Sequence, residues 1–367
     1  MDKKNNLRKF VLLPLSKLYG LGVGMRNMFF DWGWRKTRSF DIPVITVGNL
    51  AVGGTGKTPH TEYLVRLLQN DFNIGILSRG YRRQTKGFVL ATPHSVPRDI
   101  GDEPYQMYHK FGRRVMVAVC ENRCLGIDKM REINPALNLI ILDDGFQHRK
   151  VKPDVSVLLT EFQNPYYSDK MLPYGRLRES KKGAVRADLV IVTKCPVDAA
   201  PIDYRIVHSN LNCIPDQGPY FTRIRYENPR PVFPSSVKKD SVPTLEDLTE
   251  NDRLLVICGI ANPVPFVKYV KSFAPLVKVN IFSDHHEFTR KDMDTICERF
   301  ESLPANRRYI MTTEKDAVRL INNPYFPHKL KPYIFFIPVR VGIDEGQETK
   351  LRNSIIRLIS NKQRDSK

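Results

Sequence analysis

Ala51-Val-Gly-Gly-Thr-Gly-Lys57-Thr58 lies between an apolar run, Val44–Val47, and a helix-forming run, Tyr63–Leu68. A strand, a glycine-rich loop and a helix in this order are typical of a phosphate-binding P-loop. Backbone N–H groups of such a loop surround phosphate oxygens, the lysine reaches the outer phosphates, and the threonine hydroxyl binds magnesium. The stretch therefore predicts an α/β protein that binds a nucleotide.

One position departs from the usual pattern G-x-x-x-x-G-K-[ST], because Ala51 replaces the first glycine. The loop must therefore take its backbone freedom from Gly53, Gly54 and Gly56. A chance glycine-rich turn is the alternative, which the flanking strand and helix disfavour. We expect the phosphates to contact Ala51, Val52, Gly53, Gly54, Thr55, Gly56, Lys57 and Thr58.

Composition limits the class of protein. The 367 residues suffice for two domains, and 41% of them are hydrophobic, which is enough for real cores. The net charge of +19 indicates an anionic partner, which can be a nucleic acid, a phosphorylated substrate or an acidic membrane surface. Six cysteines without a C-x-x-C pair fit a reducing cytoplasm.

The N-terminal segment combines basic and apolar residues. Residues 1–38 carry nine Lys and Arg against two Asp, and they end in an aromatic group that includes Trp32 and Trp34. The uninterrupted apolar run is shorter than the ~20 residues of a membrane span. We expect a helix that starts near Pro14 and lies on an anionic membrane; the alternative is a helix packed on the protein's own core.

Strand-like and helix-like runs alternate along most of the chain, which predicts a parallel sheet covered by helices. Prolines interrupt this alternation between residues 223 and 249, and a second alternating set follows. The predicted fold is a P-loop NTPase-like parallel sheet with helices, plus a second, smaller α/β lobe. The expected division is a membrane-associating segment at 1–36, a P-loop core at 37–225, a linker at 226–249 and the smaller lobe at 250–367.

An apolar strand, Leu139–Leu142, is followed by two carboxylates, Asp143 and Asp144. This is the position of the Walker B acid, which holds magnesium beside the phosphates. Adjacent carboxylates repel each other unless a cation lies nearby. An Asp-Asp-Gly turn without a metal is the alternative.

Three more motifs lie outside the nucleotide-binding pattern. For Gly101-Asp-Glu-Pro104, the alternative to a functional site is a plain helix start with Asp102 as N-cap. For Leu172-Pro-Tyr-Gly-Arg-Leu-Arg178-Glu179, the alternative is a solvated charge cluster. For Asp284-His-His286, the alternatives are a loop histidine pair and a metal site.

Taken together, these motifs resemble the tetraacyldisaccharide 4′-kinase family of lipid A biosynthesis. The resemblance rests on their order, with Ser78-Arg-Gly-Tyr81, Asp143-Asp-Gly-Phe-Gln-His148 and Thr313-Glu-Lys-Asp316 in addition, and it extends to about residue 320. Members of this family are membrane-associated P-loop kinases. They transfer the γ-phosphate of ATP to the 4′-hydroxyl of a tetraacylated glucosamine disaccharide 1-phosphate, which gives lipid IVA.

The resemblance implies a role for each matching residue. Lys57 and Thr58 would hold ATP and Mg²⁺, with the metal surrounded by Asp143, Asp144 and Glu179. Asp102 would accept the proton of the 4′-hydroxyl and His285 would pair with it. Arg178 would suit a phosphate, because guanidinium groups match phosphate oxygens. Gln147 and His148 would line the same cleft without an assigned role.

The resemblance also implies a lipid substrate, an anionic membrane surface and no nucleic acid as partners. It places the protein at the cytoplasmic face of the inner membrane, either peripheral or anchored by its N-terminus. The competing interpretation is a P-loop GTPase or ATPase switch, such as a metal-insertion or partitioning protein. Thr193-Lys194 resembles a guanine-reading motif, but Pro196 occupies the position of its aspartate. A nucleic-acid-binding ATPase would explain the charge, yet no RNP-type or helix-turn-helix signal is present.

Overall fold

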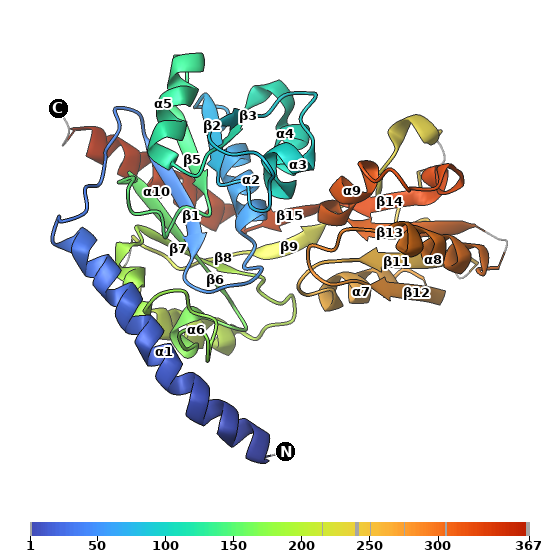
Figure 1. Ribbon diagram of the computed structural model, residues 1–367, viewed down its shortest axis with the longest axis horizontal. Coiled ribbons are helices and arrows are strands. Elements are labelled where there is room, and N and C mark those ends of the chain that lie inside the picture. Colours follow the sequence, from blue (N-terminus) through green and yellow to red (C-terminus); the bar gives the residue numbers. More distant parts are fainter. Residues whose placement is uncertain are drawn as a thin grey trace.

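The computed structural model describes residues 2–214, 216–238, 242–249, 251–274, 276–304 and 307–364. These residues form a larger and a smaller α/β lobe, connected by a two-stranded antiparallel ribbon (Figure 1). The ribbon consists of β9 (Arg223–Tyr226) and β15 (Val339–Gly342). The expected fold class is therefore confirmed.

The larger lobe contains an eight-stranded sheet in the order β3-β4-β2-β5-β1-β6-β7-β8. All neighbouring strands are parallel except β3, which runs antiparallel to β4. The central strands are buried at nearly every position, as parallel strands covered on both faces must be. The strands are β1 (Val44–Asn49), β2 (Ile74–Ser78), β3 (Val89–Leu90), β4 (Met116–Val119), β5 (Leu139–Asp143), β6 (Val155–Glu161), β7 (Leu189–Thr193) and β8 (Tyr220–Phe221).

Strand β1 lies between β5 and β6, with Val47 in register with Asp143. Strands β2 and β5 lie on one side of β1, and β6 lies on the other. The loops that follow β1 and β5 therefore lead away from each other at the carboxyl ends of these strands. Open parallel sheets bind ligands at such switch points. The P-loop and the two carboxylates after β5 therefore meet at one edge of the sheet.

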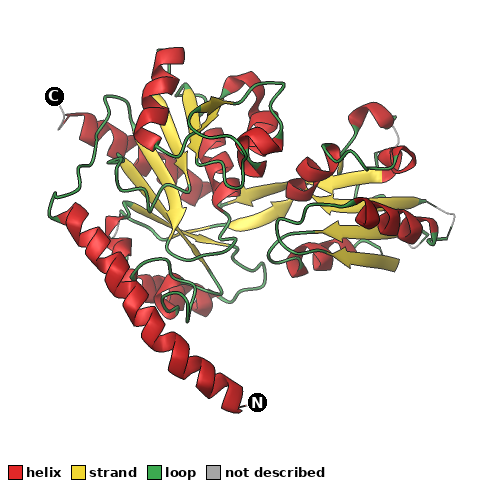
Figure 2. Cartoon of the chain, viewed as in Figure 1, coloured by secondary structure: helices red, strands yellow, loops and turns green. Residues whose placement is uncertain are grey.

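Helices cover both faces of this sheet (Figure 2). One face packs against α2, α4 and α10, and the other against α5 and α6. Their bounds, with the short α3, are α2 (Lys57–Leu68), α3 (Pro97–Ile100), α4 (Asp102–Phe111), α5 (Arg123–Ile133), α6 (Pro201–Leu211) and α10 (Glu345–Arg364).

The smaller lobe contains a five-stranded sheet in the order β10-β14-β13-β11-β12, with apolar cores on both sides. The expected strand Tyr333–Val339 is split in two around Pro338, which has no N–H group to continue the ladder. The elements of this lobe are β10 (Arg230–Pro231), β11 (Arg253–Cys258), β12 (Leu276–Ile281), β13 (Arg308–Thr313), β14 (Ile334–Ile337), α7 (Val264–Lys271), α8 (Arg290–Glu301) and α9 (Glu314–Ile321).

The boundaries of the two lobes differ from the expected division. After the smaller lobe the chain returns to the larger one and forms helix α10 there. Leu351 and Ile355 of this helix are fully buried in the core of the eight-stranded sheet. Part of the expected linker 226–249 also belongs to the smaller lobe, because β10 pairs with β14. Residues 239–241 of that linker, and residue 250, lie outside the described residues. An amphipathic pattern predicts that a helix has a buried face, but it does not tell which sheet that face covers.

The N-terminal helix α1 extends over Asp2–Asp31 and therefore begins well before Pro14, which lies inside it. A proline within a helix removes one hydrogen bond and can be tolerated where neighbouring turns continue the helix. Of the expected segment 1–36, residue 1 is outside the described part of the chain. Every described helix is too short or too polar to cross a bilayer.

Helix α1 is apolar on its outer side, and both polar and apolar side chains, Ser16 and Phe30 among them, are buried where it meets the larger lobe. Outward side chains are strongly exposed, for example Phe10 (85%) and Leu18 (66%). On the inner side, the Ser16 hydroxyl donates to the carbonyl of Met171 at 2.7 Å. The helix thus packs on the protein's own body and at the same time presents an apolar stripe to the outside.

Candidate active site

The P-loop connects β1, which ends at Asn49, to α2, which begins at Lys57. Gly53 and Gly56 have φ angles of 112° and 86°, a region of backbone space that favours glycine. These two glycines are therefore required by backbone conformation, as expected, whereas Gly54 is not among the residues with positive φ.

The structure also explains why the loop tolerates alanine at its first position. Ala51 forms an antiparallel bridge with Leu177, and it is not among the residues with positive φ. Its backbone is extended, so a Cβ atom adds no strain there. Next to it, the N–H of Val52 donates to the carbonyl of Arg176 at 2.7 Å. The motif around residues 172–179 thus acts as a backbone partner of the P-loop.

Buried polar contacts fix the inner side of the loop. The side-chain amide of Asn49 donates to the Thr55 hydroxyl at 2.7 Å, and the Thr193 hydroxyl donates to the Thr55 carbonyl at 3.0 Å. Thr193 belongs to the segment that resembled a guanine-reading motif. Its side chain serves here to hold the P-loop.

His60 on α2 is a supporting residue that the sequence reasoning missed. Its Nδ1 lies 2.7 Å from the carbonyl of Gly56, and its Nε2 lies 2.9 Å from the hydroxyl of Thr222. Burial lowers the pKa of His60 to about 4, so the ring is neutral at physiological pH. A histidine on the inward face of the helix that follows a P-loop was the available signal.

The two carboxylates after β5 occupy different environments. Asp143 is buried and accepts a hydrogen bond from the Thr61 hydroxyl at 2.9 Å, whereas Asp144 is partly exposed. Burial, and then the neighbouring Asp144, raise the pKa of Asp143 to about 6. Lys57 Nζ lies 3.7 Å from Asp144 Oδ1, and Arg178 Nη1 lies 3.4 Å from Oδ2 of the same carboxylate. The P-loop lysine, the arginine and both acids therefore meet in one place.

This group of residues fits a magnesium ion bound together with a nucleotide. A buried acid whose pKa is raised by a second carboxylate is relieved by a divalent cation. Thr58 follows Lys57 in the first turn of α2, where a P-loop presents its metal-binding hydroxyl. Across the described part of the chain, no three His, Cys, Asp or Glu side chains form a metal site by themselves. Such a site would have to be completed by nucleotide phosphates, which is how Mg²⁺ is usually bound.

Glu179, the third expected metal ligand, is held by protein donors. Both of its oxygens lie 2.9 Å from Arg186 Nη2, and Asn27 of α1 donates to Oε2 at 3.1 Å. Gln147 Nε2 lies 3.4 Å from Oε1. Glu179 therefore connects α1 to the loop after β5, and a metal role would require it to exchange these partners.

Asp102 and His285 come together although 183 positions of sequence separate them. Asp102 is the first residue of α4, and Gly101 takes the cap position, so the carboxylate does not act as an N-cap. His285 Nδ1 lies 3.7 Å from Asp102 Oδ2. Arg319 on α9 contacts both side chains. The neighbouring His286 instead pairs with Asp292 at 2.9 Å, which makes it a local structural contact.

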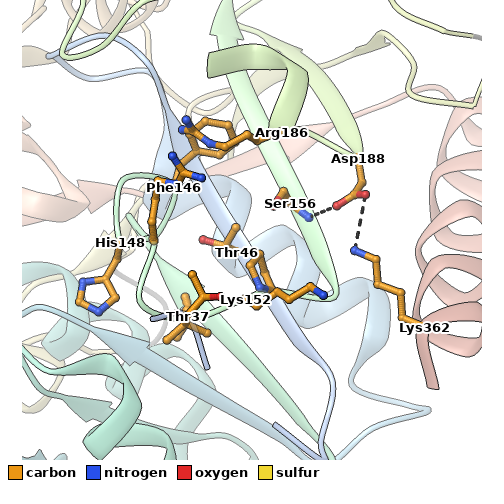
Figure 3. A pocket seen from close by; sticks show the side chains of 14 residues that line it. Thr37, Thr46, Phe146, His148, Lys152, Ser156, Arg186, Asp188 and Lys362 are labelled. Carbon is orange, nitrogen blue, oxygen red and sulfur yellow. Dashed lines mark hydrogen bonds and ion pairs between the residues drawn. The ribbon is translucent and has the colours of Figure 1, made fainter. Parts of the chain in front are cut away.

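A cavity of about 210 Å³ lies behind the loop that follows Asp144, on the sheet face between α5 and α6 (Figure 3). Several of its cationic side chains already face carboxylates. Arg186 pairs with Glu179, and Lys362 lies 3.6 Å from Asp188, whose other oxygen accepts the N–H of Ser156. The cavity is thus separate from the P-loop, but it shares Arg186 with the site described above.

The larger lobe carries a glycine-rich loop with left-handed glycines and a lysine that faces the strand-end carboxylate Asp144, and the smaller lobe brings His285 to Asp102. These features define a P-loop phosphotransferase. The comparisons with known proteins identify the family. Residues 8–358 match the model of the tetraacyldisaccharide-1-P 4′-kinase family, so the chain belongs to that family.

Related proteins support the assignment over nearly the whole chain. A tetraacyldisaccharide 4′-kinase of Bacteroides thetaiotaomicron is 47% identical over 360 residues, which cover 97% of this chain and 94% of the relative. The enzyme of the same name from Flavobacterium johnsoniae is 42% identical and covers 91% and 93%. A crystal structure of LpxK from Aquifex aeolicus in complex with ATP superposes with a TM-score of 0.71 at 28% identity, covering 96% of this chain and 99% of that one. These findings favour the kinase over a GTPase or ATPase switch.

Proposed function

We propose that this chain transfers the γ-phosphate of ATP to the 4′-hydroxyl of a tetraacylated glucosamine disaccharide 1-phosphate, which gives lipid IVA. Family membership supports the reaction, and one structural observation supports the location of the active site. Lys57 faces Asp144 in the larger lobe, while the smaller lobe brings His285 to Asp102. A kinase needs both halves, one for the nucleotide and one for the acceptor hydroxyl.

The nucleotide half would work by positioning and charge. Lys57 and the backbone N–H groups of the P-loop would hold the phosphates, with Arg178 ready to contact the transferred group or the 1-phosphate of the acceptor. Thr58, Asp143 and Asp144 would hold Mg²⁺, and Glu179 would join them if it leaves Arg186. When bound, the ion would neutralise charge on the phosphoryl oxygens.

The acceptor half would move one proton. As the 4′-hydroxyl oxygen bonds to the γ-phosphorus and the bond to the ADP oxygen breaks, Asp102 would take the hydroxyl proton. In the described part of the chain, Oδ1 of Asp102 receives no hydrogen bond, so this oxygen is available. His285 would orient the carboxylate and share its charge.

The acceptor lipid suggests a role for helix α1. Its outer stripe is apolar and its surroundings are basic, which suits the interface of an anionic membrane, with Trp32 and Trp34 at its far end. We therefore place the protein at the cytoplasmic face of the inner membrane as a peripheral protein. Its partners would be the lipid substrate and the membrane surface, and no nucleic acid is required to explain the net charge of +19.

The direct test is a phosphotransfer assay. Purified protein is incubated with ATP labelled on the γ-phosphate, Mg²⁺ and the tetraacyl disaccharide 1-phosphate in detergent micelles. We expect label in the lipid at the 4′ position, and no lipid label when Mg²⁺ is chelated. Release of labelled phosphate without lipid labelling would contradict the kinase and favour an NTPase switch.

A further inference from the structure

Arg319 on α9 belongs to none of the motifs named above, yet its side chain lies between Asp102 and His285. Its guanidinium group is largely buried, with the side chain only 10% exposed, and it crosses from the smaller lobe to the larger one. A buried arginine normally has several polar partners, because desolvating its charge is costly. Those partners show what the residue does.

The first partner is Asp102. Arg319 Nε and Nη2 both donate to Oδ2 of Asp102, at 2.8 Å and 2.6 Å. Both hydrogen bonds thus occupy the same carboxylate oxygen, and Oδ1 is left for another ligand. The guanidinium fork therefore fixes which oxygen of Asp102 can face an acceptor hydroxyl.

The second partner is His285. Arg319 Nη2 lies 3.0 Å from Nδ1 of the ring, closer than the 3.7 Å between Nδ1 and Asp102. A guanidinium group and an ammonium group only donate hydrogen bonds. Lys315 Nζ lies 3.0 Å from Nε2 of the same ring and 3.2 Å from Asp284 Oδ1. A donor therefore faces each ring nitrogen, and Arg319 fixes the orientation of the His285 ring as well as that of the Asp102 carboxylate.

The third nitrogen of the guanidinium group is anchored inside the smaller lobe. Arg319 Nη1 lies 3.3 Å from Asp316 Oδ1, and the other oxygen of Asp316 accepts the N–H of Gly259 at 2.8 Å and the Thr313 hydroxyl at 2.7 Å. Asp316 is fully buried. A guanidinium group that is held by all three of its nitrogens loses little conformational freedom when it binds a further group.

We propose that Arg319 is a positioning residue of the phosphotransfer reaction, which holds Asp102 and His285 in their working arrangement from the smaller lobe. The proposal rests on the proposed function, because it assigns Asp102 the role of proton acceptor. Arg319 itself does not touch the reacting atoms. It joins the two lobes at the site where the acceptor hydroxyl must be placed.

The pH dependence of kcat distinguishes a positioning role of Arg319 from a merely structural one. The charged groups around Asp102 are Arg319 and Lys315 on α9, Glu103 on α4, and His285 after β12. Burial by itself would raise the pKa of Asp102, but the contacts with His285 and Arg319 outweigh it, and the pKa is lowered. Removing the guanidinium group would raise this pKa, typically by about 1 unit or more for an acid that loses an arginine partner. The acidic limb of the kcat profile would then move to higher pH.

The chain offers a matched control in the same interface. Lys110 on α4 also crosses between the lobes, where it binds Glu62 on α2 at 2.6 Å and Glu314 on α9 at 2.9 Å. It makes no contact with Asp102 or His285. Lys110→Ala therefore weakens the lobe contact without disturbing the proposed proton acceptor.

The experiment measures kcat and KM for both substrates from pH 3 to 9 with full-length protein, because the pKa of Asp102 lies below 3.8 in the wild type. We expect Arg319→Ala to lower kcat by roughly 100-fold, the cost of a misplaced catalytic group, with KM for ATP nearly unchanged. The acidic limb should move up by about 1 pH unit. Arg319→Lys, which retains the charge but places all its donors on one nitrogen, should recover part of kcat and the original limb. Lys110→Ala should lower the melting temperature and leave the limb in place.

Two outcomes would overturn the proposal: an acidic limb that is the same in Arg319→Ala and wild type, or an equal shift in Lys110→Ala. If Arg319→Ala does not fold, Arg319→Lys and Arg319→Gln give the same comparison, since Gln keeps a donor and removes the charge. A wild-type protein without lipid phosphorylation would instead contradict the proposed function. The two failures are therefore distinguishable.

Discussion

The hydroxyl of Thr61 donates a 2.9 Å hydrogen bond to Oδ1 of Asp143. The bond connects the helix that follows the P-loop to the end of the neighbouring strand β5. Because Asp143 is buried, this contact sets the orientation of the carboxylate before any nucleotide binds. Preorganised polar groups of this kind reduce the reorganisation that a reaction requires.

Lys57→Ala is expected to abolish lipid phosphorylation and leave the fold intact. The ammonium group would contact the outer phosphates, and loss of one such electrostatic contact typically costs ~3 kcal/mol of transition-state stabilisation, or about 100-fold in rate. The measurement is the rate of γ-phosphate transfer together with the melting temperature. Lys129→Ala on the surface of α5 is the control, and it should have normal activity. Normal turnover in Lys57→Ala would contradict the P-loop assignment.

Asp143→Asn is expected to stabilise the free protein while it removes activity. The pKa of Asp143 in the folded state, about 6, lies above the unfolded value of 3.8. The folded state therefore binds the proton more readily between these values, so the stability falls as the pH rises from 3.8 to 6 and the full cost is present above pH 6. By linkage the cost is about 3 kcal/mol at pH 7.5, about half of that at pH 5, and about 0.5 kcal/mol at pH 4.

Urea unfolding at these three pH values, without ATP or Mg²⁺, measures the effect. Asparagine keeps the acceptor for Thr61, so the gain in unfolding free energy should follow the same pH dependence. Asp144→Asn is the comparison, because its partly exposed carboxylate should give a much smaller gain. A loss of stability in Asp143→Asn at pH 7.5 would show that the carboxylate is not strained by burial.

Substitutions on the outer stripe of α1 are expected to release the protein from membranes. Deleting residues 1–36 would also remove Asn27 from Glu179, so point variants give a cleaner test. Phe10→Ser, Leu18→Ser and Leu21→Ser combined should reduce flotation with anionic vesicles and raise the KM for lipid more than that for ATP. Ser16→Ala, on the packed side, should float like wild type. Equal flotation of the triple variant would mean that this stripe does not contact the bilayer.

Asp102→Asn and His285→Ala are expected to act on one step. Each should lower kcat severely with little change in ATP affinity, and the double variant should be scarcely worse than the poorer single one, because residues that share a role are non-additive. The check is a double-mutant cycle on kcat, with melting temperatures measured alongside. Losses that add, as for independent sites, would remove the pair from the mechanism.

Much of the nucleotide half was predictable because its signal is local. The P-loop is a continuous stretch of sequence, and its glycines are demanded by backbone angles that any chain must adopt to surround a phosphate. The two carboxylates follow an apolar strand, and parallel strands bring their carboxyl ends to one edge of a sheet. The fold class of both lobes followed from the same alternation of strands and helices.

Tertiary structure alone decided the contacts between distant segments. The motif pattern pointed to Asp102 and His285, but Arg319 between them comes from α9 and carries no motif of its own. The carboxylate of Glu179 already accepts hydrogen bonds from Arg186 and Asn27, and the sequence does not show that these three residues meet. Helix α10 covers the sheet of the larger lobe although it follows the smaller one in sequence. Periodicity shows that a face is apolar and composition shows that a charge is present, whereas the partner of each is set by packing across the whole chain.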